Sequence, residues 1–226
     1  MQRAQIVRIE QHHHLVRSFF LVPEHPVPFV AGQFVAIALE EGGTERSYSI
    51  ASRPGSAEIE LCIALKPDGY ISPALFAMKP GDTLYLSEAR GSFTLPLDGT
   101  EVCMICTGTG IAPFRSMLLE ALQKGDMRTF YLISGNRCAA EALYHDEITA
   151  LSARHPNFRY LPALSREEAA GFAHGYVHPI YETLFADGRD ARFLVCGWTA
   201  MLSDARRKLK EMGYNRRQYF FESYDG

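Results

Sequence analysis

The pattern of apolar residues changes near residues 96–100, and this change limits the folds that the chain can adopt. Before it, short segments of strand length and strand-favouring composition are separated by turn-forming Gly and Pro residues. After it, apolar strands alternate with helical segments. The first pattern predicts an antiparallel barrel, and the second predicts a parallel sheet with helical crossovers. We therefore expect two domains, residues 1–97 and residues 98–226.

The segments can be placed along the chain from this pattern. In the first domain, the expected strands are residues 5–11, 14–22, 34–39, 46–51, 58–64 and 83–87. A short helix is expected at residues 72–78, with Ser72 as its N-cap and Pro73 as its first helical residue. In the second domain, the expected strands are residues 102–107, 129–134, 158–164 and 192–196, and the expected helices are residues 113–124, 140–153, 179–185 and 200–212. The predicted fold is a six-stranded antiparallel β-barrel followed by a Rossmann-like α/β domain with a parallel sheet.

Composition excludes some classes of protein. The chain has 226 residues, enough for two small domains, and its formal net charge of −3 gives no general attraction to nucleic acid. No apolar run reaches the roughly 18–20 residues that span a bilayer. The first residues also lack the apolar core of a signal peptide. We expect a cytoplasmic monomer with no membrane segment and no nucleic-acid partner.

The cysteines and the three histidines at residues 12–14 do not predict a metal site. The five cysteines are odd in number and scattered, which argues against a disulfide framework. Cys103 and Cys106 have C-x-x-C spacing, but an apolar strand would send them to opposite faces, and no second pair completes a site. Strand alternation would likewise split the histidines between two faces. We expect a buried structural role for Cys103 and Cys106, and partly exposed strand positions for the histidines.

Residues 46–49, with the sequence RSYS, place a fixed cation, an aromatic ring and two hydroxyls on one expected strand. Alternation along a strand sends Arg46 and Tyr48 to one face and the two serines to the other. A guanidinium suits a phosphate, a phenol ring suits a flat heteroaromatic face, and a hydroxyl can hydrogen-bond a ring nitrogen. The combination fits a flavin nucleotide. An ordinary surface strand is the alternative for this motif on its own.

A second feature of the first domain suits a phosphate. Residues 68–73 place a glycine and a hydroxyl at the start of the expected short helix, where unpaired N–H groups form an anion site. Together with residues 46–49, this helix start would supply a second contact to one diphosphate. On its own, the segment could be an ordinary capped helix.

Four polar clusters follow the four expected parallel strands, at the edge where such sheets bind ligands. Their glycines allow the main chain to approach phosphate, and one pair, Ser165 and Arg166, suits a phosphate monoester. Each cluster alone could be an ordinary polar loop. Together they predict a dinucleotide with one additional phosphate, hence NADP(H) rather than NAD(H), and hydride transfer to the flavin. The clusters are TGTG at 107–110, SGNR at 134–137, SRE at 165–167 and CGW at 196–198.

In these motifs and in their order, the chain resembles the ferredoxin–NADP reductase superfamily, and more narrowly its bacterial flavodoxin/ferredoxin–NADP reductases. The resemblance covers nearly the whole chain. No single motif is specific, but their combination is. The motifs are RSYS at 46–49, GYIS at 69–72, SEARG at 87–91, GTGIAP at 108–113, SREEAAG at 165–171, CGWTAM at 196–201 and ESY at 222–224.

The resemblance implies roles for residues in both domains. At the position of hydride transfer, it places Ser49, Cys196 and Glu222. It implies that FAD is held by Arg46, Tyr48, Ser49, Gly69, Ser72 and Tyr224, the last on a C-terminal tail that returns to the uncovered flavin face. It implies that NADP(H) is held by Thr109, Gly110, Arg137, Ser165 and Arg166. The chain departs from some bacterial members at Gly175 and Tyr176, where they carry another Arg, and we expect Tyr176 to stack on adenine there instead. No metal is implied.

The resemblance also implies an enzyme, a ferredoxin/flavodoxin–NADP reductase with ferredoxin or flavodoxin as its electron partner. A local excess of cations suits an acidic carrier of this kind, although a solvated helix face is the alternative. These cations are Arg206, Arg207, Lys208, Lys210, Arg216 and Arg217.

Three other functions remain open from the sequence. They are a reductase component of an oxygenase, a flavin reductase, and a flavin-binding redox sensor or electron-transfer subunit. The diphosphate motif argues against the flavin reductase because it suggests a retained FAD. The complete nucleotide clusters argue against the sensor, which would not need a nicotinamide pocket.

Overall fold

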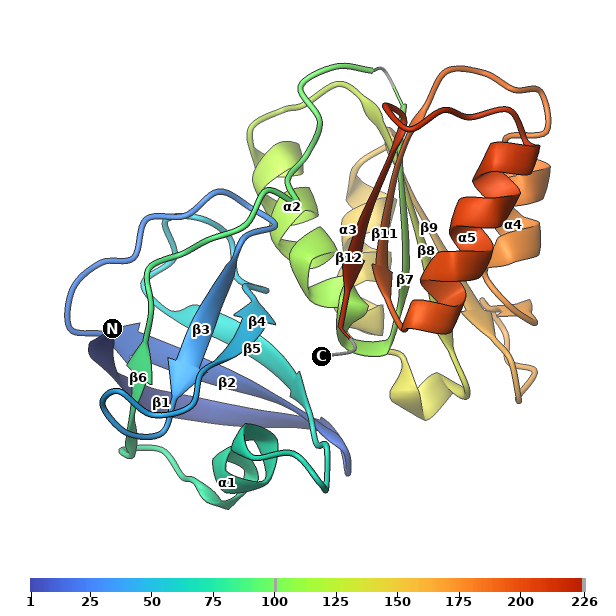
Figure 1. The fold of residues 1–226 in the computed structure, drawn as a ribbon. Helices are drawn as coiled ribbons and strands as arrows, with labels where there is room; N and C mark the ends of the chain where they lie inside the picture. The colour runs from blue at the N-terminus through green and yellow to red at the C-terminus, as the bar shows by residue number, and fades with distance from the viewer. Residues whose placement is uncertain (100, 225–226) are drawn as a thin grey trace. The chain divides into compact units, whose positions relative to one another are not determined.

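A computed structural model describes residues 1–99 and 101–224 and divides the chain into two compact units (Figure 1). The first unit is Met1–Leu95 with Ala112–Gln123, and the second is Pro96–Ile111 with Lys124–Gly226. The segment Ala112–Gln123 follows the first strand of the second unit in the chain but packs with the first unit. Thr100, the last residue of the segment where the sequence pattern changes, and the last two residues of the expected tail, 225–226, lie outside the described residues.

The first unit is a closed antiparallel barrel, as predicted. Its strand order is β4-β3-β6-β1-β2-β5. The two outer strands of this order meet, because Ile50 after β4 bridges Leu61 in β5 and the Ala51 N–H donates to the Glu60 carbonyl at 2.8 Å. Closure leaves no exposed sheet edge. The strands are β1 (Gln2–His13), β2 (Val16–Pro23), β3 (Phe34–Ala38), β4 (Arg46–Ser49), β5 (Ile59–Ala64) and β6 (Thr83–Leu86).

Apolar residues at alternate strand positions fill the barrel. Phe19 and Leu21 on β2 are fully buried, as are Val35 and Ile37 on β3, and all four belong to one core cluster. Burying a side chain of this size contributes about 1.5–3 kcal/mol of stability. The same alternation places the side chains of Phe20 and Ala36 on the opposite face of their strands.

The short helix α1 (Ile71–Ala77) begins one residue before the expected N-cap. Ser72 lies inside the helix, and its Oγ accepts the Lys66 N–H at 2.9 Å and lies 3.3 Å from the Lys66 carbonyl. Tyr70 precedes the helix without a side-chain capping bond. The prediction that Ser72 is the N-cap is therefore wrong, because its hydroxyl bonds back to the preceding loop.

The second unit contains a six-stranded sheet in the order β10-β9-β8-β7-β11-β12, and every pairing in it is parallel. This confirms the predicted parallel α/β architecture. Two of its strands were not predicted: β10 has only two residues, and β12 lies in the segment expected to form a tail. The strands are β7 (Glu101–Thr107), β8 (Thr129–Asn136), β9 (Phe158–Leu164), β10 (Ala173–His174), β11 (Arg192–Gly197) and β12 (Tyr219–Ser223).

Helices connect the parallel strands, as the alternating pattern predicts (Figure 1). Helix α2 (Ile111–Gln123) follows β7, α3 (His145–Arg154) follows β8, α4 (His178–Leu184) precedes β11, and α5 (Thr199–Glu211) follows β11. Within the described residues, none of the helices combines the length and apolar character needed to cross a membrane.

Candidate functional site

The strand order of the second unit reverses at β7, which lies between β8 and β11. At such a switch point the connections leave in opposite directions and open a crevice at the carboxyl ends of the strands. The register pairs Cys106 with both Cys196 and Ser134. The polar clusters that follow β7, β8 and β11 therefore lie next to one another.

Three glycines at this edge stand where a side chain would collide with a neighbour. A Cβ on Gly110 would lie 2.5 Å from the Cys196 carbonyl oxygen, and a Cβ on Gly197 would lie 2.4 Å from Thr107 Oγ1. A Cβ on Gly135 would lie 2.8 Å from a methyl carbon of Val177. The chain after β7 thus approaches the end of β11 at Gly110 only because this position lacks a side chain, and the other two glycines leave room for Thr107 and Val177.

Thr107 ends β7 at the same edge. Its Oγ1 atom is buried and has no hydrogen-bond partner among the described residues. An unpaired buried hydroxyl costs about 1–3 kcal/mol, so a bound ligand that completes the bond would be favoured. Thr107 lies in one predicted cluster but not among the named binding residues. The glycine-lined edge and this hydroxyl together fit a nucleotide.

Strand β12 brings two of the predicted catalytic residues together. It runs parallel to β11 with Glu222 opposite Cys196, and the Tyr224 N–H donates to the Gly197 carbonyl at 3.2 Å. Burial raises the pKa of the Cys196 thiol, and the nearby Glu222 carboxylate raises it further. The thiol is therefore neutral at physiological pH. Ser49, the third predicted catalytic residue, lies in the first unit.

The predicted flavin motif occupies β4 of the barrel. Arg46 is exposed and donates from Nη1 to the Glu45 carbonyl at 2.8 Å. The Tyr48 ring packs against the core, and burial raises the pKa of its phenol to about 12. Ser49 is buried. An exposed guanidinium and a half-buried neutral phenol ring on one strand are groups that suit a flavin and its diphosphate.

The second predicted phosphate contact is a tight turn before α1. The Gly69 N–H donates to the Lys66 carbonyl at 2.8 Å, and a Cβ on Gly69 would lie 3.0 Å from that oxygen. Ser72 is buried and its hydroxyl already bonds to Lys66. A phosphate would therefore meet a turn whose hydroxyl has an internal partner, and phosphate binding by Ser72 stays a prediction.

The residues predicted for the adenosine end lie on adjacent loops after β8 and β9. The Ser165 N–H donates to the Asn136 carbonyl and the Arg166 N–H to the Arg137 carbonyl, each at 3.0 Å. Tyr176 lies further along the chain and is 73% exposed. An open cavity of about 520 Å³ adjoins the second loop and is lined by Glu168, Ala169, Ala170, Phe172 and His174.

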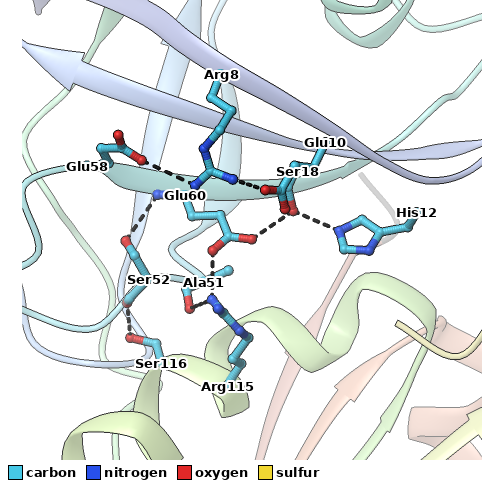
Figure 2. A network of polar contacts seen from close by, with 10 residues as sticks. All are labelled: Arg8, Glu10, His12, Ser18, Ala51, Ser52, Glu58, Glu60, Arg115 and Ser116. Carbon is cyan, nitrogen blue, oxygen red and sulfur yellow. Dashed lines mark hydrogen bonds and ion pairs between the residues drawn. The ribbon is translucent and has the colours of Figure 1, made fainter. Parts of the chain in front are cut away.

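A buried polar network in the first unit was not predicted (Figure 2). At its centre is Glu60, which is 3% exposed. Its Oε2 accepts from Arg115 Nη1 at 2.7 Å, and its Oε1 accepts from the Ser18 hydroxyl at 2.8 Å. His12 Nε2 lies 2.9 Å from Ser18 Oγ, and burial lowers the pKa of His12 although the Glu60 carboxylate opposes this. Because the four residues lie on four different elements, no spacing in the sequence indicates them.

The network fixes the segment that follows the flavin motif. Arg115 Nη1 also donates to the Ala51 carbonyl at 2.8 Å, and the Ser116 hydroxyl donates to the Ser52 carbonyl at 2.7 Å. The Ser52 hydroxyl in turn accepts the Glu60 N–H at 3.0 Å. Helix α2 is thus hydrogen-bonded to Ala51 and Ser52, which follow β4 (Figure 2).

The predicted docking cations are partly neutralised within the protein. Arg207 bonds to Asp204 and Glu211, and Lys208 bonds to Glu182 at 2.6 Å. The other predicted cations are exposed, and one of them, Arg206, lies over the ring of Phe221 at 4.7 Å. No group of three or more His, Cys, Asp or Glu side chains in the described parts of the chain is placed to hold a metal ion.

Both halves of the chain match known domain families. Residues 4–95 match the oxidoreductase FAD-binding domain, and residues 104–207 match the oxidoreductase NAD-binding domain. The reductase component of a phenol 2-monooxygenase from Pseudomonas sp. (strain CF600) is 33% identical over 92% of the chain, which spans 61% of the length of that relative. Ferredoxin–NADP reductase B of Sorangium cellulosum is 32% identical, with 87% of the chain and 86% of the relative covered. A flavodoxin/ferredoxin–NADP reductase of Escherichia coli is 33% identical, with 83% and 82% covered.

Solved structures give the same picture. A cytochrome P450 reductase of Amycolatopsis has a TM-score of 0.91 and 26% identity, with 99% of this chain and 69% of that chain covered. A ferredoxin NADP⁺ reductase from Neisseria gonorrhoeae, solved with bound FAD and NADP, has a TM-score of 0.87 and 27% identity, with 98% and 97% covered. The structural similarity therefore extends over both units.

Proposed function

The chain belongs to the ferredoxin–NADP reductase superfamily of FAD- and NAD-binding oxidoreductases. We propose that it transfers a hydride between NADP(H) and FAD. We also propose that it passes single electrons between FAD and a separate ferredoxin or flavodoxin. The observation that carries the proposal is the edge of the parallel sheet at β7. There a buried Thr107 hydroxyl, without a partner among the described residues, lies among closely packed glycines. The other unit of the same chain carries groups that suit a flavin.

In this proposal the first domain, residues 1–97, holds FAD. Tyr48 would stack on the flavin ring, and Ser49 would bond near its reactive nitrogen. Arg46 would bind the diphosphate together with the turn at Gly69 and Ser72. When bound, FAD supplies the redox chemistry, since it exchanges two electrons with a nicotinamide and one at a time with a carrier. The contribution of the protein is to bind and orient the ring.

The second domain, residues 98–226, binds the nicotinamide nucleotide. Thr109 and Gly110 would hold its phosphates, and the role proposed for Tyr224 is to cover the flavin ring until nicotinamide binds. Cys196 and Glu222, which are opposite each other on β11 and β12, would border the reacting carbon of the nicotinamide. Burial keeps the Cys196 thiol neutral, so it adds no charge next to the ring. At the adenosine end, the additional phosphate and the adenine are held by Arg137, Ser165, Arg166 and Tyr176.

A second candidate function is that of a reductase component that serves an oxygenase. The internal pairing of Arg207 and Lys208 favours it, because fewer cations remain to attract an acidic ferredoxin or flavodoxin. A phenol 2-monooxygenase reductase component is also among the relatives.

Anaerobic titration of the FAD-loaded protein tests the proposal. NADPH should bleach the flavin absorbance, and bleaching by neither NADPH nor NADH would contradict the proposed reaction. The reduced protein is then mixed with a ferredoxin, a flavodoxin or an oxygenase component. Rapid oxidation by one of the first two supports the first candidate, and rapid oxidation only by the third supports the second.

A further inference from the structure

Arg137, one of the two arginines proposed to hold the adenosine end of the nucleotide, already has a carboxylate partner. Its Nε donates to Glu141 Oε2 at 2.9 Å, and its Nη2 lies 2.8 Å from Glu141 Oε1. These two contacts occupy one edge of the guanidinium in a bidentate arrangement. Both side chains reach solvent, with 51% of Arg137 and 20% of Glu141 exposed. A phosphate that binds Arg137 must displace Glu141 or lie close to it.

The surrounding loops carry more anions than cations. Residues 134–141 and 165–171 contain two arginines against three glutamates, a formal sum of −1. Glu167 is held in this cluster because its Oε2 accepts the Ala139 N–H at 2.8 Å, and Glu168 lines the adjoining cavity. The second arginine, Arg166, is exposed beside them. A dianionic phosphate therefore meets a site whose own charge does not balance it.

We propose that Glu141 sets the selectivity of this site between NADPH and NADH. By holding Arg137 and by its own charge, Glu141 opposes the 2′-phosphate of NADPH. The uncharged 2′-hydroxyl of NADH meets no such repulsion and can donate a hydrogen bond to a carboxylate. The inference rests on the proposed function, because it concerns the nucleotide that the same site binds.

The size of the effect follows from Coulomb's law. A carboxylate about 5 Å from a dianionic phosphate weakens binding by roughly tenfold in water at low salt. Glu141→Gln should therefore strengthen the binding of 2′-phospho-AMP by about tenfold and that of AMP by less than about twofold. The gain should shrink in high salt because exposed charges are screened. Calorimetric titration of the FAD-loaded protein measures both affinities without any turnover.

Two further variants isolate the cause. Glu211→Gln is the matched control, because Glu211 pairs with Arg207 at 3.1 Å and at the same spacing of four residues, but on α5, which follows β11 rather than β8 or β9. It should leave both affinities unchanged. In the double variant Arg137→Ala with Glu141→Gln, most of the gain for 2′-phospho-AMP should disappear, because Arg137 is the group that Glu141 releases.

The outcomes separate this inference from the proposed function. Equal gains for AMP and 2′-phospho-AMP would overturn the role of Glu141. A full gain that persists without Arg137 would overturn the part assigned to Arg137 and leave the charge of Glu141 as the cause. If NADPH reduces the flavin but the ratio of the affinities for NADPH and NADH is unchanged in Glu141→Gln, the role of Glu141 is overturned and the proposed reaction is supported. A selective gain for 2′-phospho-AMP in a protein whose flavin neither nucleotide reduces would support the role of Glu141 and contradict the proposed reaction.

Discussion

Replacing Arg115 with Met tests whether the buried network stabilises the first unit through its charges. Arg115 Nη1 lies 2.7 Å from Glu60 Oε2, and the two side chains are 14% and 4% exposed. Without Arg115, the Glu60 carboxylate stays buried with no cation beside it, which costs about 3–5 kcal/mol. The Ala51 carbonyl also loses its bond from Arg115, worth about 1 kcal/mol. We expect the free energy of unfolding of this unit to fall by about 4–6 kcal/mol.

Urea unfolding followed by circular dichroism measures the loss, with FAD at a fixed concentration in every sample because a bound ligand raises apparent stability. The double variant Arg115→Met with Glu60→Gln removes both charges and should recover most of the loss. Glu58→Gln is the control for an exposed pair, since Glu58 lies 3.4 Å from Arg8 with both side chains more than a third exposed. It should cost less than about 1 kcal/mol.

A loss in Arg115→Met no larger than the loss in Glu58→Gln would show that the buried Glu60 charge does not need Arg115. A double variant as unstable as Arg115→Met would contradict the prediction too, because the loss would then come from packing rather than from an unpaired charge.

Three further predictions concern single residues. Burial lowers the pKa of His12 below its ordinary 6.5, so the unfolded chain binds a proton at this residue more readily than the folded one. The free energy of unfolding of the first unit should therefore fall as the pH drops below 6.5. His12→Gln should make that free energy less dependent on pH. Thr107→Val should leave the melting temperature unchanged or higher and should raise the KM for NADPH by about five- to tenfold. A lower melting temperature with an unchanged KM would show that the Thr107 hydroxyl stabilises the fold and does not bind the nucleotide. Tyr48→Leu should release FAD during gel filtration while Tyr85→Leu, on β6, should retain it; retention by both would argue against stacking by Tyr48.

The architecture was predictable because both units follow simple periods. Buried residues at alternate positions, such as Val35 and Ile37, indicate the barrel strands, and continuous apolar runs such as residues 102–106 indicate parallel strands covered on both faces. The packing of Ala112–Gln123 with the first unit was not predictable, because its polar anchors, Arg115 and Ser116, bond to residues more than fifty positions earlier in the chain.

The parts of the candidate site that follow from the order of strands and loops in the sequence were predictable. Loops at successive strand ends must meet at one sheet edge, so the clusters after β7, β8 and β11 could be grouped without a structure. Tertiary ion pairs carry no such signal. Lys208 is neutralised by Glu182 from another helix, and no pattern within α5 indicates that pairing. The spacing of Arg137 and Glu141 is visible in the sequence, but their bidentate contact depends on the loop that follows β8.

Flavin reduction by a deuterated nucleotide is the sharpest test of the proposed hydride transfer. The FAD-loaded protein is mixed anaerobically with NADPH or with NADPH carrying deuterium at the transferred position of C4, and the flavin absorbance is followed by stopped flow. We expect bleaching by both, slower with deuterium, because in the proposed reaction the hydride leaves C4 of the nicotinamide for the flavin. An absence of bleaching with NADPH and with NADH would contradict it.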